Sequence, residues 1–241
     1  MNRPRKIAII AALKREIAPL VKDWHATTFT YEGREFTVHE SNYAVVVCGG
    51  IGAECARRVA EAVVWKYSPN VLISVGVAGA AVPELHIGDV IFPAVVVDTQ
   101  DGSRHETAIQ KAPIAQSSLA RSVLASSRQI VSGEQKRRLA KSYGAHVVDM
   151  EASGVARAAQ IHNLQFLAVK AISDEIEFDI SELNRLIHGG KFATGALVRY
   201  LVPRPWLWLK MIRLARNTQL ASENLCAWLR ESALTNTIVS G

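Results

Sequence analysis

Three acidic residues each follow a short apolar segment of the kind that forms a buried strand. They are Glu16, Glu151 and Asp174, and the segments before them are Lys6–Ala12, Val147–Met150 and Phe166–Ile172. Ligands of open α/β sheets bind outside the carboxyl ends of the strands, so these acids are candidates for one site. Separated carboxylates can divide the work of a general acid and a general base. For any one acid alone, the alternative is a helix-start residue that stabilises the helix dipole.

Two glycine-rich segments, Gly49–Gly52 and Gly76–Gly79, also follow predicted strands. Glycine lets the backbone approach a ligand, and the exposed N–H groups suit hydroxyl or phosphate oxygens. The dinucleotide fingerprint G-x-G-x-x-G is incomplete, because the sequence from Gly50 reads G-I-G-A-E-C. A sugar or base pocket is therefore a better interpretation than an NAD site, with tight turns that bind nothing as the alternative.

The elements that must position these residues alternate between strand and helix. Further strands are predicted at Thr37–Glu40, Tyr43–Cys48, Val71–Val75 and Asp89–Val97, and helices at Ala53–Tyr67, Gly133–Tyr143, Ser153–His162 and Ser181–Leu201. This pattern predicts an α/β fold with three layers, in which helices flank a mostly parallel central sheet.

A C-terminal helical extension is predicted after the main domain. Pro203 and Pro205 end one helix and start another, so we expect a domain over residues 1–203 and an extension over 204–241. Its apolar positions form one helical face, which is expected to pack on the domain or on the partner subunit of a homodimer: Leu207, Met211, Leu214, Thr218, Ala221, Leu225 and Trp228. Because Arg213 and Arg216 lie away from this face, and Trp206 and Trp208 stand at its start, peripheral membrane contact through Pro205–Leu229 is the alternative.

Charge is concentrated in the same part of the chain. The 241 residues have a formal net charge of +6, and seven basic residues but no acid lie between Leu183 and Ser222. The rest of the chain is nearly neutral, so no nucleic-acid partner is expected. Three cysteines argue against a disulfide framework, and the polar residues Asp98, Asp101 and His105 are interpreted as a loop, so no metal is expected. The N-terminal apolar run is too short for a signal peptide, and a cytoplasmic protein is expected.

Five motifs occur in the order of one family. They lie at Lys6–Glu16, Gly49–Gly52, Ser74–Gly79 with Ile87–Val90, Val148–Ala152, and Ala171–Asp174. Through them, residues 6–201 resemble the nucleoside phosphorylase superfamily, and in particular its methylthioadenosine/S-adenosylhomocysteine nucleosidase branch. The resemblance implies a nucleoside phosphorylase-like fold, a purine nucleoside substrate and no cofactor.

The resemblance also implies roles for individual residues. Asp174 matches the acid that protonates the leaving adenine, Glu151 the carboxylate that holds the ribose hydroxyls, and Glu16 the base that activates water. The resemblance implies that the remaining substrate-binding residues are Met150, Ser173, Val77, Ala78, Gly79 and Gly50. The implied reaction is cleavage of the N-glycosidic bond of a 5′-substituted adenosine.

Departures from the branch leave alternatives open. Val77 replaces a serine of the nucleosidase turn, and the segment Asp98–Ser127 is shorter. Lys14 and Arg15 precede the predicted base and could serve a phosphate cosubstrate, as in a phosphorylase. The related hopanoid-associated phosphorylase, which acts on a lipid-linked adenosine, matches the Val148–Glu151 motif equally well. A nucleoside-binding module without turnover is the remaining alternative.

Overall fold

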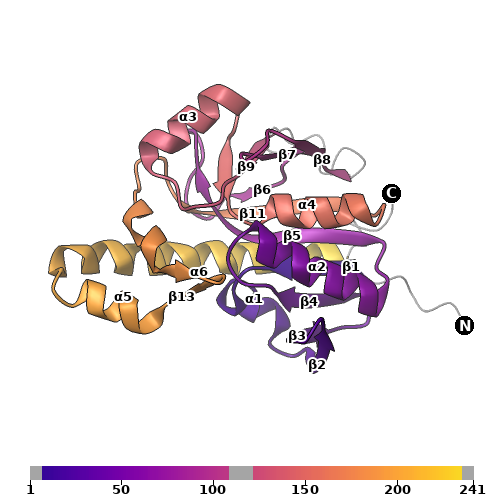
Figure 1. The fold of residues 1–241 in the computed structure, drawn as a ribbon. Coiled ribbons are helices and arrows are strands. Elements are labelled where there is room, and N and C mark those ends of the chain that lie inside the picture. Colours follow the sequence, from indigo (N-terminus) through magenta and orange to yellow (C-terminus); the bar gives the residue numbers. More distant parts are fainter. Residues whose placement is uncertain (1–6, 109–121, 235–241) are drawn as a thin grey trace, which may run out of the picture.

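The computed structural model describes residues 7–108 and 122–234. Its central strand is β5 (Val71–Ala80), which pairs in parallel with β1 (Ile7–Ala11) on one side and with β11 (Gln165–Asp174) on the other. These strands are buried on both faces, which explains why each is a nearly continuous apolar run. Figure 1 shows helices on both sides of this sheet.

The other strands extend the sheet in both directions. Beyond β1 lie β4 (Ala44–Cys48), β3 (Arg34–Glu40) and β2 (His25–Tyr31). Beyond the end of β5 lie β10 (Val147–Asp149), β9 (Val123–Ser126), β7 (Val95–Asp98) and β8 (Arg104–Glu106), and β6 (Val90–Ile91) pairs with β11. The inner pairings are mostly parallel, whereas the pairs β2–β3, β3–β4 and β7–β8 towards the edges are antiparallel.

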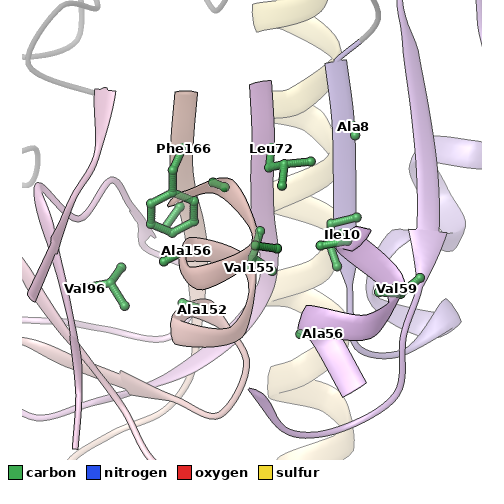
Figure 2. Close-up of a cluster of buried hydrophobic side chains, with 14 of the residues drawn as sticks. Ala8, Ile10, Ala56, Val59, Leu72, Val96, Ala152, Val155, Ala156 and Phe166 are labelled. Atoms are coloured by element: carbon green, nitrogen blue, oxygen red, sulfur yellow. The ribbon is translucent and has the colours of Figure 1, made fainter. Parts of the chain in front are cut away.

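Side chains of the inner strands point alternately to the two faces of the sheet, and each set packs against one layer of helices. Ala8 and Ile10 of β1 contact the layer formed by α2 (Ala53–Tyr67) and α4 (Ala152–Ile161), as Figure 2 shows. Ile7 and Ile9 face the opposite layer, formed by α1 (Lys14–Val21) and α6 (Pro205–Leu234). The predicted three-layer α/β fold with a mostly parallel sheet is therefore confirmed.

The predicted elements agree with the structure except in two places. The segment Asp89–Val97 is divided into β6 and β7, with Pro93 between them. The single helix predicted over Ser181–Leu201 is wrong. The structure has a 3-10 helix (Ser181–Leu186), the hairpin strands β12 (Ile187–His188) and β13 (Lys191–Phe192), and α5 (Thr194–Leu201). Gly189 and Gly190 have φ of 56° and 79°, a left-handed conformation that an α-helix cannot contain.

The C-terminal helix α6 begins at Pro205, and its two halves differ in their surroundings. From Thr218 to Leu229 its inner face belongs to the same core as β1 and α1, and Leu225 and Cys226 are fully buried. From Pro205 to Asn217, Leu207 is the one buried residue. Across residues 7–108 and 122–234, no helix is long and apolar enough to span a membrane. The boundary at residue 203 stays a prediction, but the helix beyond it is part of the core.

Replacing Leu225 with alanine should lower the free energy of unfolding by about 2–5 kcal/mol, because it leaves a cavity between α6 and the sheet. Urea denaturation followed by circular dichroism measures this change. Leu209→Ala is the matched control on the same helix, since Leu209 is largely exposed and its loss should change the free energy by less than about 0.5 kcal/mol. Equal effects of the two substitutions would contradict the described packing of α6.

Candidate active site

A cavity of about 170 Å³ lies at the carboxyl ends of β1, β5, β10 and β11. Eight of the nine residues predicted for the site line it: Glu16, Val77, Ala78, Gly79, Met150, Glu151, Ser173 and Asp174. The cavity is closed by apolar residues from three other segments, namely Ile130, Ile180, Ile187 and Leu214. The strand-end rule therefore brings together residues that are up to 158 positions apart in the sequence, from Glu16 to Asp174.

Two glycines of β5 mark the two ends of this cavity, Gly76 beside Glu16 and Gly79 beside Asp174. A Cβ atom on Gly76 would lie 3.3 Å from Glu16 Oε2, and one on Gly79 would lie 2.6 Å from Asp174 Oδ2. These glycines are three positions apart in an extended strand, which corresponds to roughly 10 Å along β5. Each glycine leaves room for one carboxylate, so Glu16 and Asp174 lie against different positions of β5.

Glu16 lies in the first turn of α1, where the N–H of Leu13 donates a hydrogen bond to Oε2 at 3.0 Å. Its side chain is buried. Burial raises the pKa of Glu16 above its usual range, although the Leu13 hydrogen bond and the positive charges of Lys170 and Arg15 act in the opposite direction. A carboxylate with a raised pKa is a stronger base, which is the property that water activation needs.

Glu151 comes immediately before α4, and its Oε1 accepts a hydrogen bond of 2.8 Å from the N–H of Gly52. Burial and the negative charge of Asp149 raise the pKa of Glu151 to about 8, against the opposing charge of Lys170. The charge of Glu16 raises the pKa further, so Glu151 and Glu16 form one electrostatic group at the same end of the cavity.

The positively charged residue among these acids is Lys170, which sequence reasoning missed. It lies in β11 with 1% of its side chain exposed, and its Nζ forms an ion pair of 2.9 Å with Asp149 Oδ2 and donates to Ser74 Oγ at 3.0 Å. Burial alone would lower the pKa of Lys170, but the charges of Asp149 and Glu151 raise it above its usual range. A lysine within the apolar segment Phe166–Ile172 was the available signal, because a buried lysine requires an acidic partner.

The other end of the cavity holds Asp174. The pairing of β11 with β5 shifts register between Ile172 and Asp174, and this irregularity at Ser173 accompanies the placement of the carboxylate beside Gly79. Ser173 Oγ donates to Asp174 Oδ1 at 2.8 Å. Both carboxylate oxygens have partners, because Asp174 Oδ2 also binds the ammonium of Lys136.

Lys136 comes from α3 (Gly133–Tyr143) and is almost fully buried. Its Nζ also donates to the carbonyl oxygens of Glu175 at 2.9 Å and Phe178 at 3.4 Å, so its three N–H groups are all engaged. Ser132 and Gln135 form a reciprocal capping box that fixes the start of this helix. Nothing in the polar sequence of α3 distinguishes Lys136 from a surface lysine, so the sequence contained no signal for it.

Gly50 is the one predicted residue outside the cavity lining. Its N–H donates to the carbonyl of Ala12 at 3.0 Å, and a Cβ atom there would lie 2.9 Å from the carbonyl oxygen of Gly190. Gly50 therefore lets two backbone segments approach closely. This position favours a structural role for Gly50 over contact with the substrate. Of the two basic residues before Glu16, Arg15 lines the cavity and Lys14 does not.

The interpretation of Asp98, Asp101 and His105 as a loop holds only for Asp101, which lies in a turn, because Asp98 ends β7 and His105 lies in β8. Asp98 and Asp101 both form ion pairs of 2.7 Å with Arg157. Among the residues that the structure describes, no group of three or more His, Cys, Asp or Glu side chains has the geometry of a metal site. The carboxylates of the cavity bind to backbone N–H groups, lysines and a serine instead.

The raised pKa of Glu151 predicts how stability depends on pH. The folded state holds this proton more tightly than the unfolded chain does, so the free energy of unfolding should fall as pH rises from about 4.5 to about 8. Glu151→Gln should make this fall shallower, measured by urea denaturation at several pH values. Glu84→Gln, which changes an exposed carboxylate, is the control and should retain the wild-type slope. A wild-type slope in Glu151→Gln would contradict a protonated, buried Glu151.

Known nucleosidases are similar to this chain in sequence. The sequence is 22% identical over 224 residues to aminodeoxyfutalosine nucleosidase of Campylobacter jejuni, which covers 80% of this chain and 97% of that protein. It is 34% identical over 94 residues to 5′-methylthioadenosine/S-adenosylhomocysteine nucleosidase of Shewanella halifaxensis, which covers 38% of this chain and 41% of that protein.

Solved structures share the whole fold. The nucleosidase of Helicobacter pylori that acts on 5′-methylthioadenosine and S-adenosylhomocysteine, solved with a bound ligand, has a TM-score of 0.72 at 19% identity and covers 98% of this chain and 100% of its own. Futalosine hydrolase of the same organism has a TM-score of 0.71 at 19% identity and covers 96% and 98%. The family model of the phosphorylase superfamily matches residues 6–201. The chain therefore belongs to the phosphorylase superfamily and is an enzyme.

Proposed function

We propose that this enzyme hydrolyses the N-glycosidic bond of a 5′-substituted adenosine and releases adenine. The observation that carries the proposal is the pair of carboxylate groups at opposite ends of one cavity. Glu16 and Glu151 lie beside Gly76 and Gly52 at one end, and Asp174 lies beside Gly79 at the other. A nucleoside that spans this distance would place its sugar between the first two acids and its base against the third.

The chemistry of glycosidic cleavage matches this separation. As the bond between the anomeric carbon and the base nitrogen breaks, its electron pair moves to the base and positive charge develops on the sugar. A proton delivered to N7 of the purine from the Asp174 end neutralises the leaving group, which is typically worth about 10²- to 10⁴-fold in rate. At the other end, Glu16 takes a proton from the water whose oxygen bonds to the anomeric carbon.

Glu151 is assigned to the ribose hydroxyls. A hydroxyl that donates to its free oxygen would favour the ionised carboxylate, so substrate binding would offset the burial and the Asp149 charge that raise its pKa. Negative charge next to the sugar then stabilises the positive charge that develops there, an interaction that is stronger in the transition state than in the ground state. Met150 lines the cavity next to Glu151 and would contact the sugar ring.

Lys136 gives the leaving-group end a fixed geometry. Its ammonium uses all three N–H groups on Asp174, Glu175 and Phe178, so it holds Asp174 in place and is assigned here as a positioning residue. For Asp174 to serve a purine, at least one of its present hydrogen bonds must be exchanged for one to the base. Ser173, whose hydroxyl rotates freely, is the partner that can be exchanged without uncovering a buried charge.

Water is favoured over phosphate as the nucleophile. Once a bound sugar hydroxyl favours the ionised form of Glu151, the carboxylates at this end of the cavity would repel a phosphate dianion, and Lys170 is already engaged by Asp149 and Ser74. The curated relatives named above are also nucleosidases. Arg15, which lines the cavity, is the observation that favours phosphorolysis, and the cosubstrate is therefore tested directly.

Purified enzyme should release adenine from methylthioadenosine, S-adenosylhomocysteine or aminodeoxyfutalosine at the same rate with and without inorganic phosphate. Chromatography identifies the base, and a reducing-sugar assay distinguishes a free sugar from a sugar phosphate. Release that requires phosphate would establish phosphorolysis instead. If none of these nucleosides nor adenosine is cleaved under either condition, while binding is detected by calorimetry, the protein is a binding module and the proposed reaction is wrong.

Asp174→Asn should retain the fold and lower turnover by at least about 10²-fold, because the amide cannot deliver a proton to the base. The matched control is Asp101→Asn, which removes a carboxylate that binds Arg157 outside the cavity and should leave turnover unchanged. Steady-state release of adenine measures both variants. Turnover in Asp174→Asn equal to that of the control would assign Asp174 a purely structural role.

A further inference from the structure

An unusual exposed apolar surface lies where α5 meets the first half of α6. Its residues, which we name the α5–α6 surface, are Val198, Val202, Trp206, Trp208, Leu209 and Ile212. Leu209 is 77% exposed, Trp206 68% and Val202 63%. Figure 1 shows α5 and the start of α6 side by side at one end of the molecule, away from α2 and α4. Apolar residues grouped in this way on one surface mark an interaction site more often than scattered ones do.

Positive charge surrounds this surface. Five basic residues lie within the same two helices and their connection: Arg199, Arg204, Lys210, Arg213 and Arg216. No acidic residue lies between Leu183 and Ser222. Within the described part of the chain, Arg213 has a surface ion pair of 3.5 Å with Glu175, and no ion pair is formed by Arg199 or Arg216. The surface therefore combines exposed apolar side chains with an excess of positive charge, of which Arg213 is paired with Glu175.

This charge argues against a second copy of the chain as the occupant. A twofold interface places the same patch of both subunits face to face, so the basic residues would repel their own copies. An anionic lipid bilayer has the complementary charge and an apolar interior within reach of exposed side chains. The indole N–H of Trp208 already donates to the carbonyl of Leu201 at 2.8 Å, so this side chain needs no further polar partner.

We propose that the α5–α6 surface docks the enzyme on an anionic lipid bilayer. Trp206 and Leu209, three residues apart on one side of α6, would enter the boundary between headgroups and acyl chains, with the arginines at the level of the phosphates. The helix would lie in the plane of the membrane. Leu214 and Thr218 of the same helix line the cavity, so docking would hold the proposed catalytic site near the bilayer.

Sedimentation of the full-length enzyme with vesicles tests the proposal. Vesicles of phosphatidylcholine with phosphatidylglycerol should bind it, and vesicles of phosphatidylcholine alone should bind it much less. Added salt should weaken the binding, because exposed charges are screened. Leu209→Glu should reduce partitioning at least about tenfold, since it removes an inserted apolar side chain and adds a repelled charge. Arg216→Gln should reduce it about fivefold.

Ile161→Glu is the matched control, because Ile161 is 65% exposed at the end of α4 on another face of the molecule. It should bind vesicles as the wild type does. Equal binding by Leu209→Glu and Ile161→Glu, or equal binding to both kinds of vesicle, would overturn the proposal. So would a wild-type dimer that Leu209→Glu converts to a monomer in light scattering, since the surface would then be a subunit interface. Adenine release from a soluble nucleoside, assayed without vesicles, tests the proposed reaction separately.

Discussion

The buried ammonium of Lys170 is the interaction on which the arrangement of Asp149, Glu16 and Glu151 depends. It lies at the centre of the sheet, where β11 pairs with β5, and Ser74 and Asp149 bind it from the neighbouring strands. Removing it would leave the Asp149 carboxylate buried without a cation, and Asp149 Oδ1 already lacks a hydrogen-bond partner within the described residues. A buried ion pair of this kind does little for net stability, but it fixes which strands must be adjacent.

The same cation acts on both acids for which we propose roles at this end of the cavity. Glu16 reaches the cavity from α1, and Glu151 reaches it from the start of α4. The pKa of each carboxyl group is raised above its usual range. Without Lys170, both would be driven further towards the neutral form, which can neither take a proton from water nor stabilise a cationic sugar. Asp174, at the far end of the cavity, has a separate cation in Lys136. Each acidic region of the cavity therefore has a buried lysine of its own.

The sequence predicts those features of the fold and of the site that depend on local patterns, and it misses contacts between residues that are far apart in the sequence. The apolar segments identified the inner strands, and the strand-end rule then placed Glu16, Glu151 and Asp174 together without knowledge of their contacts. The lysines were missed because their partners lie on other elements: Lys136 and Asp174 are 38 residues apart, and Lys170 and Ser74 are 96 apart. The helix predicted over Ser181–Leu201 failed for a local reason, because its composition is helical but Gly189 and Gly190 turn the chain.

The C-terminal helix shows why a regular pattern does not by itself say what a face contacts. Its apolar positions continue at helical spacing from Leu207 to Trp228, yet Met211 and Leu214 are only partly buried, whereas most positions from Thr218 onwards are buried. Before that point the helix contacts α5 and the segment that holds Glu175 and Phe178, and most of its other side is exposed. Removing the helix would therefore remove part of the core together with the exposed surface. Single substitutions on α6 can separate the two roles, because Leu225 and Leu209 belong to the same helix but to different surroundings.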